Sequence, residues 1–355
     1  MPKIEHLTNA LSPHRKPTRH THPTAKAKPS FSPPPPRPNP LKYRTIPIVL
    51  GSITLLGLSG YISYLYVLLS RPPPENIPTL PSHQADVSQT YNTIASSFDS
   101  HVSVTEQATG INTLRRKLAK LAHGDVLEVS IGTGRNLEYY EFDFKRGNEG
   151  GGQKKGLVRS FTAVDKSAEM LEIAHDKFGK LFPGILGVRW VIGDASQPGI
   201  IPPPPKSANE RSGNLEGKKY DTILQTMGLC SVDDPVALLK SLGEHVVEEE
   251  GRILLLEHGR GKWKWLNGAL DRGAEGHAKQ FGCWWNRDFT DVIEESGLEV
   301  VRVERPKWWH GGTTWWIELK KPRSSSPGSV KQVGESVKEV VEEVKAKKGF
   351  SLWAS

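Results

Sequence analysis

Cysteine is scarce in this sequence, since its 355 residues include only Cys230 and Cys283. Two cysteines are too few to build a disulfide framework, and they lack a metal-type spacing such as C-x-x-C. A thiol nucleophile would need an activating partner, and the sequence does not identify one. We therefore expect both residues to be buried free thiols.

Most of the chain also lacks any excess of charge, although the formal net charge is +8. Residues 1–44 contain nine Lys and Arg side chains against one acid, Glu5, so the remaining chain carries 38 basic and 38 acidic side chains. The excess positive charge thus lies in residues 1–44 and does not indicate what the rest of the chain binds. We do not expect a nucleic-acid partner.

Charged side chains are missing altogether from Thr45–Ser70, a run of 26 residues bounded by Arg44 and Arg71. About 20 apolar residues suffice to cross a bilayer core as a helix, and three tyrosines fall toward the C-terminal end, where amphipathic rings prefer the membrane interface. The run therefore predicts one transmembrane helix in a lipid bilayer. A buried core helix is the alternative, although the run is long for one.

The flanking composition divides the chain further. Residues 1–44 are basic, poor in acids and rich in Pro, Ser, Thr and His, so they resemble a mitochondrial targeting leader. A single-pass protein of the mitochondrial inner membrane is expected, and the side that the folded domain faces is left open. We predict a linker at residues 71–86 and the folded domain at residues 87–320. Residues 321–355 form the predicted tail, in which the spacing of valines predicts an amphipathic helix.

The folded segment predicts an α/β domain, because short β-branched runs alternate with helical stretches such as Ser167–Phe178 and Pro235–Val247. Such alternation implies a mainly parallel sheet covered on both faces. A short Gly-rich connection between the last two strands permits an antiparallel hairpin at the sheet edge. The expected strands are Val126–Val129, Phe161–Val164, Val188–Ile192, Tyr220–Leu224, Arg252–Leu256, Glu299–Val303 and Trp315–Leu319.

The main chemical signal is the segment Glu128-Val-Ser-Ile-Gly-Thr-Gly134, where a hydrophobic strand runs into a turn of small residues. Gly132 and Gly134 would let the backbone approach a ligand closely. A dinucleotide fold would instead show G-x-G-x-x-G to hold a pyrophosphate. A carboxylate at Glu128 would repel phosphate, so the turn suits a cationic ligand.

Two further acids follow the next two strands. Asp165 stands where one carboxylate can bind two ribose hydroxyls, and Asp194 stands where it can accept a hydrogen bond from an adenine amine. A lone Asp after a strand is more often a helix N-cap. Acids at three successive strand ends, with Glu128 as the first, form a much more specific pattern.

With these motifs, residues 87–320 resemble the class I S-adenosylmethionine-dependent methyltransferases, which implies a Rossmann-like sheet and S-adenosylmethionine as cofactor. By this resemblance Glu128 faces the methionine amino group, and Gly132 and Gly134 line the methionine backbone. Asp165 would hold the ribose and Asp194 the adenine.

The same resemblance places Gln225 and Thr226, at the end of the fourth strand, against the methionine end of the cofactor. The sequence departs from the family at Ser130, where glycine is usual, although serine is small enough for binding to survive. Neighbouring positions complete the expected cofactor site: Tyr91, Ser130, Asn136, Lys166, Met170 and Ala195.

The flanking segments are more particular. Met227–Pro235, Leu256–Gly261 and Gly276–Asp288, with the leader and span, resemble fungal mitochondrial methyltransferase-like proteins of the inner membrane. Quinone-ring methyltransferases and membrane-associated thiol methyltransferases fit less closely. No N-P-P-Y-type segment follows the fourth strand, which disfavours exocyclic amino groups of nucleobases as acceptors. The expected acceptor is an apolar or membrane-derived small molecule.

Methyl transfer from a sulfonium needs positioning and no catalytic nucleophile, and a base matters only if the acceptor must lose a proton. His258 follows the fifth strand and is the first candidate for such a base, ahead of His277 and His310. A structural hydrogen bond is the alternative role for each histidine. The rival hypothesis for the whole chain is a non-catalytic, cofactor-binding assembly or scaffold protein, motivated by Ser130 and by the lack of a clear base.

Overall fold

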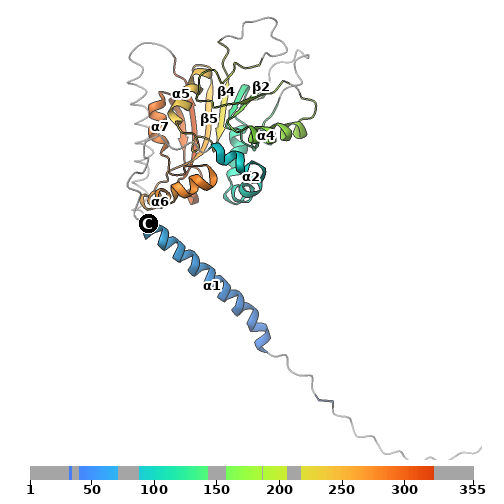
Figure 1. Cartoon of the computed structure of the whole chain (residues 1–355), viewed down its shortest axis with the longest axis vertical. Helices are drawn as coiled ribbons and strands as arrows, with labels where there is room; N and C mark the ends of the chain where they lie inside the picture. Colours follow the sequence, from blue (N-terminus) through green and yellow to red (C-terminus); the bar gives the residue numbers. More distant parts are fainter. Residues whose placement is uncertain are drawn as a thin grey trace, which may run out of the picture. The chain divides into compact units, whose positions relative to one another are not determined.

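The computed structural model describes residues 32–33, 40–70, 88–142, 157–185, 187–205 and 217–323 (Figure 1). Most of the predicted leader, the linker 71–86 and the tail helix expected within 321–355 lie outside the described residues. Residues 143–156 and 206–216, within two polar stretches that interrupt the α/β pattern, also lie outside the described residues.

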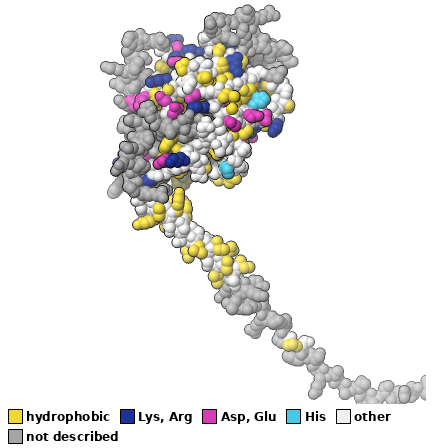
Figure 2. All heavy atoms as spheres, in the orientation of Figure 1, with side chains coloured by type: hydrophobic (Ala, Val, Ile, Leu, Met, Phe, Trp, Pro, Cys, Tyr) yellow, Lys and Arg dark blue, Asp and Glu magenta, His cyan; other side chains and the backbone are white. Residues whose placement is uncertain are grey.

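Helix α1 spans Pro40–Ser70 and contains the uncharged run. Within it, Thr45–Val67 has a mean hydropathy of 1.7, and none of its most apolar stretch is buried. Figure 2 shows hydrophobic side chains along its exterior. At 1.5 Å per residue the 23 residues extend about 35 Å, which exceeds the roughly 30 Å of a bilayer core. Length and composition thus make α1 a candidate membrane span.

The strands of the folded domain form one sheet in the order β3-β2-β1-β4-β5-β7-β6. The first five strands in this order pair in parallel, and β7 pairs antiparallel with β5 and β6. The predicted mostly parallel sheet with an antiparallel edge is therefore confirmed. The strands are β1 Gly124–Val129, β2 Val158–Asp165, β3 Arg189–Ile192, β4 Thr222–Thr226, β5 Arg252–His258, β6 Glu299–Glu304 and β7 Thr314–Lys320.

Helices cover both faces of this sheet (Figure 1). Because side chains alternate along a strand, Leu127 packs with α5 and α7 on one face, and Val126 packs with α3 and α4 on the other. The helices are α2 Ser88–Thr109, α3 Ile111–Ala119, α4 Ala168–Leu181, α5 Pro235–His245, α6 Lys264–Phe281 and α7 Phe289–Ser296, with short 3₁₀ helices η1 Leu137–Tyr139 and η2 Trp308–His310.

The helical spacing of Val87, Tyr91, Ile94 and Phe98 predicts a helix that ends near Phe98, whereas α2 continues to Thr109. Its second half is rich in Ser and Thr, which are weak helix formers. Tertiary ion pairs compensate, since Asp99 and Glu106 both pair with Arg135 in the turn after β1, at 2.9 and 3.0 Å. The extension thus ties α2 to that turn.

The turn after β1 needs three residues with positive φ: Ser130 at 52°, Gly132 at 58° and Gly134 at 73°. A Cβ at Gly134 would lie 2.5 Å from the Leu137 side chain, so glycine is required there. At Ser130 the left-handed conformation costs about 1–2 kcal/mol for a residue with a Cβ. Gln225 Nε2 donates a hydrogen bond to Ser130 Oγ at 3.1 Å, which offsets part of that strain.

Substitutions at Ser130 should separate these two effects. Ser130→Gly removes about 1–2 kcal/mol of strain and a hydrogen bond worth about 1 kcal/mol, so its unfolding free energy should stay within about 1 kcal/mol of wild type. Ser130→Val places a β-branched side chain at positive φ and should destabilise the protein by about 2 kcal/mol or more. Unfolding of the full chain in detergent measures both, and equal destabilisation by the two variants would contradict the strain argument.

Candidate active site

A cavity open to solvent lies at the carboxyl ends of the parallel strands. This is the edge where open α/β sheets bind ligands, beside the point where the strand order reverses between β1 and β4. The lining comes from α2, α3, the turn after β1, the ends of β2, β3 and β4, and the segment that leads into α5.

Nine of the thirteen predicted cofactor residues line this cavity. They are Tyr91, Ser130, Gly132, Asp165, Lys166, Met170, Asp194, Ala195 and Thr226. The structure thus brings together residues from five separate segments, as expected for side chains that follow neighbouring parallel strands. The other four predicted residues, Glu128, Gly134, Asn136 and Gln225, are not part of the lining.

Asp165 is held in a fixed orientation at the end of β2. Its Oδ2 accepts a hydrogen bond from the Gly132 amide at 2.7 Å, and its Oδ1 accepts one from the Ser167 amide at 2.9 Å. Burial raises the pKa of this carboxyl group, against the opposing effect of the backbone donors. Each oxygen has a further lone pair, so the group can accept hydrogen bonds from a ligand.

Asp194 is fixed in a similar way at the end of β3. Its Oδ1 accepts hydrogen bonds from the backbone amide and the hydroxyl of Ser196, at 2.9 and 2.6 Å. Lys166 Nζ lies 3.4 Å from Asp194 Oδ2 and thereby links the ends of β2 and β3. The half-exposed pair forms one wall of the cavity.

Glu128 departs from its predicted position, because its side chain is buried behind the turn and does not reach the cavity. Its Oε1 accepts a hydrogen bond from Asn136 Nδ2 at 2.7 Å, and its Oε2 accepts one from the Tyr140 hydroxyl at 2.7 Å. Burial raises the pKa of Glu128 to about 7. The contact of Glu128 with a ligand amino group stays a prediction.

The remaining predicted residues also shape the turn from behind. Asn136 donates to Thr226 Oγ1 at 2.9 Å as well as to Glu128, and thereby joins the turn to the end of β4. Gln225 contacts Ser130, as described above, and Gly134 makes room for the Leu137 side chain. These contacts fix the backbone that lines the cavity.

Sequence reasoning missed Arg115, a buried cation in α3 that lines the cavity. Its guanidinium donates to Glu106 Oε1 at 2.8 Å, to Asn136 Oδ1 at 3.3 Å and to Thr226 Oγ1. Although burial opposes ionisation, Arg115 and Arg135 lower the pKa of Glu106. The sequence does carry a signal, because Arg115 falls on the apolar face of α3, where a charge needs a buried partner or a ligand.

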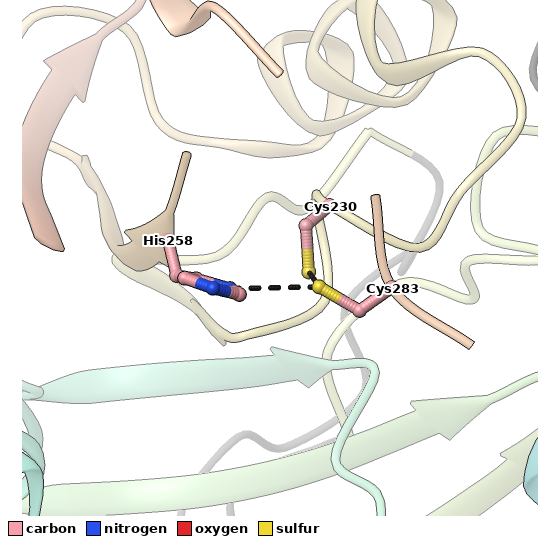
Figure 3. A group of neighbouring side chains, drawn as sticks. All are labelled: Cys230, His258 and Cys283. Carbon is pink, nitrogen blue, oxygen red and sulfur yellow. Dashed lines mark hydrogen bonds between the residues drawn. The ribbon is translucent and has the colours of Figure 1, made fainter. Parts of the chain in front are cut away.

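His258, the predicted base, ends β5 but does not line the cavity. Its side chain turns toward the two cysteines: Nδ1 lies 3.5 Å from Cys283 Sγ, which lies 2.9 Å from Cys230 Sγ (Figure 3). Both cysteines are buried free thiols, as expected, but no pattern in the sequence predicts that they meet. The position of a strand end is predictable from the pattern, whereas the path of the following loops decides which way His258 points.

The other candidate histidines make structural hydrogen bonds. His277 Nδ1 donates to the Cys283 carbonyl at 2.8 Å, and His310 Nε2 donates to the Thr109 carbonyl at 3.0 Å. Burial lowers the pKa of both rings. Neither residue lines the cavity.

Comparison with known proteins agrees with this geometry. A family model described as a methyltransferase domain matches residues 105–303, which is more than half of the chain. The mitochondrial methyltransferase OMS1 of Saccharomyces cerevisiae is 37% identical over 242 residues, which cover 66% of this chain and 46% of OMS1. The chain thus matches only about half the length of this curated relative.

Solved structures resemble the chain more distantly. A putative methyltransferase in complex with the Trm112 activator of Haloferax volcanii has 12% identity and a TM-score of 0.44, covering 66% of this chain and 98% of that one. A possible histamine N-methyltransferase of Thermotoga maritima has 17% identity and a TM-score of 0.42, covering 66% and 99%. From the match to the family model, the chain belongs to the methyltransferase-domain family, the class I S-adenosylmethionine-dependent methyltransferases that its glycine turn and strand-end acids predict.

Proposed function

We propose that this protein transfers a methyl group from S-adenosylmethionine to an apolar, membrane-derived small molecule, and that α1 anchors it in the mitochondrial inner membrane. The observation that carries the proposal is the orientation of Asp165 beside the glycine turn, in the lining of the cavity at the carboxyl ends of the strands. Family membership supports the reaction class.

The nucleoside end of the cofactor fits the walls made by β2 and β3. A carboxylate with both oxygens oriented, as in Asp165, suits the two vicinal hydroxyls of a ribose. Asp194 and Ala195, together with the buried Met170 of the lining, offer an acceptor and apolar surface for an adenine. A Cβ at Gly132 would meet no atom within 4 Å, so the turn leaves open space for the ligand.

We place the methionine end of S-adenosylmethionine beside Arg115 and Thr226. A guanidinium is the side chain best suited to bind a carboxylate, and Arg115 lines the cavity and hydrogen-bonds with Thr226. We therefore assign the cofactor carboxylate to Arg115, a role that the sequence resemblance did not supply. The bound cofactor would contribute an activated methyl group with a good leaving group, so orientation of the acceptor is the main task of the protein.

No described histidine lines the cavity, which indicates an acceptor that needs little help in losing a proton. The cavity lining also contains the hydroxyls of Tyr91 and Ser231, 2.7 Å apart, and the exposed Asp233. Burial raises the pKa of Tyr91 well above its usual value, so this residue stays neutral and can orient a bound acceptor by hydrogen bonding.

An exposed aromatic surface supports a membrane-derived acceptor. Two tryptophan pairs form it, one at the start of α6 and one in η2, with exposed fractions of 46–78%: Trp263, Trp265, Trp308 and Trp309. The pairs adjoin, since a Cβ at Gly311 beside η2 would lie 3.2 Å from Trp263. Tryptophan prefers the level of lipid headgroups, and neighbouring lysines at 262, 264 and 307 suit an anionic leaflet.

The mitochondrial location rests on two observations. The relative OMS1 is mitochondrial by name, and residues 1–44 have the composition of a targeting leader. The candidate span in α1 then supplies the anchor.

A labelled-methyl assay tests the acceptor class. Purified full-length protein in detergent, given radiolabelled S-adenosylmethionine and extracts of mitochondria that lack the endogenous protein, should transfer label to organic-soluble small molecules. Label confined to protein or RNA would contradict the proposed acceptor. Tight cofactor binding without transfer to any fraction would contradict methyl transfer and favour the scaffold hypothesis.

Removal of the ribose-binding carboxylate should weaken cofactor binding. Asp165→Ala deletes charge-assisted hydrogen bonds worth about 1.5–3 kcal/mol, so the Kd for S-adenosylmethionine should rise about tenfold to a hundredfold. Titration calorimetry measures this constant. Asp176→Ala on the exposed side of α4 is the matched control and should bind as wild type does. Unchanged affinity in Asp165→Ala would remove the central support for the site.

Glu128 should make stability depend on pH. Its pKa is about 7 in the folded protein against 4.5 as the ordinary value, so the folded state binds the proton more tightly. The resulting stabilisation is fully present below about pH 4.5 and is lost as pH rises through about 7, which amounts to about 3 kcal/mol. Glu128→Gln keeps a neutral group there. Between pH 5 and 8, wild type should lose stability relative to this variant in denaturant titrations, and parallel curves would show that Glu128 ionises normally.

A further inference from the structure

A second cluster of chemically active side chains lies outside the cavity lining. Cys230 belongs to the segment between β4 and α5, His258 ends β5, and Cys283 follows α6 (Figure 3). The ligand atoms of the three residues all lie within 4.8 Å of one another. Both cysteines are buried and His258 is half-buried. Three segments distant in sequence thus bring two thiols and an imidazole to one point.

This ligand set suits a borderline-soft divalent ion. Zinc binds thiolates at about 2.3 Å and imidazole at about 2.0–2.1 Å, so a tetrahedral site places sulfur and nitrogen about 3.5 Å apart. Cys283 Sγ and His258 Nδ1 are 3.5 Å apart. The two sulfurs, at 2.9 Å, would need to separate by somewhat less than about 1 Å.

The charges of the three ligands also favour a divalent cation. Two thiolates and a neutral imidazole around a divalent cation sum to zero, which lowers the penalty of burying the ions. A disulfide between the same cysteines would leave the imidazole without a role. We propose that Cys230, Cys283 and His258 form a zinc-binding site, with the fourth position taken by water or by an external ligand.

Hydrogen bonds from a neighbouring arginine fix the segment that contains Cys230. Arg287 is buried, and its guanidinium donates to the carbonyls of Leu229 and Val232, each at 2.8 Å. These two carbonyls flank Cys230 along the chain. The ligand loop therefore keeps its path without a metal, and preorganisation of this kind favours metal binding.

The site also borders the cavity. Ser231, next to Cys230, lines the cavity and hydrogen-bonds with the Tyr91 hydroxyl. Gly282, next to Cys283, packs against the Tyr91 ring, since a Cβ there would lie 2.8 Å from it. A bound zinc ion would join these two segments and fix Tyr91 between them. Metal binding would thus stabilise one wall of the acceptor side.

Metal content of the wild-type protein gives the first test. Full-length protein purified under reducing conditions, without added chelator, should contain about one zinc ion per chain by elemental mass spectrometry. Replacement of zinc by cobalt(II) should produce the sulfur-to-cobalt charge-transfer absorption of a thiolate site. This measurement needs no variant and so does not depend on how a variant folds.

Variants then assign the ligands. Cys230→Ser and Cys283→Ser should each lose the zinc and the charge-transfer band, and His258→Ala should weaken zinc binding tenfold or more. His277→Gln is the matched control, because its ring lies 6.1 Å from that of His258 but is outside the ligand set. It should keep full metal content.

Three results would overturn the proposal. The first is wild-type protein without zinc in which peptide mass spectra show a Cys230–Cys283 disulfide. The second is wild-type protein without zinc in which both thiols can be alkylated. The third is zinc retained by the variant that combines Cys230→Ser and Cys283→Ser. Each leaves the proposed methyl transfer untouched, since none of the three ligands lines the cavity.

Discussion

The backbone turn between β1 and η1 is the constraint on which the rest of the site depends. Three positive φ angles bend the chain sharply enough to aim the Gly132 amide at Asp165, and Gly134 leaves room for the Leu137 side chain. Ser130 shows that the turn tolerates a side chain when a neighbour such as Gln225 hydrogen-bonds to it.

A buried polar network holds that turn in place. Glu128, Asn136, Thr226, Arg115 and Glu106 form a continuous chain of hydrogen bonds from β1 through β4 to α3 and α2. Buried charges are costly unless they are paired, so each member stabilises the others. Arg115 is the member that also reaches the cavity, which makes it both a brace for the turn and a group that can bind an anionic ligand end.

The sheet and the acids after β2 and β3 could be predicted because parallel strands end at one edge, so a pattern along the chain becomes a position in space. Side-chain direction could not be predicted in the same way. Glu128 hydrogen-bonds with Asn136 and is not part of the cavity lining, and His258 turns toward two cysteines that approach through loops with no periodic signal. Arg115 was predictable in principle, as a charge on the apolar face of a helix. The length of α2 was not, because ion pairs formed by distant arginines stabilise its weak second half.

The two sides of the cavity differ in character. The proposed cofactor side is built from strand ends and fixed carboxylates, whereas the proposed acceptor side is formed by Tyr91 and the segment around Ser231. A crystal structure with bound S-adenosylhomocysteine would test the account most directly. We expect both ribose hydroxyls to donate hydrogen bonds to the Asp165 carboxylate and the amino-acid carboxylate to lie within hydrogen-bond distance of Arg115. A ligand that lies in the cavity with its carboxylate remote from Arg115, or its ribose away from Asp165, would contradict it.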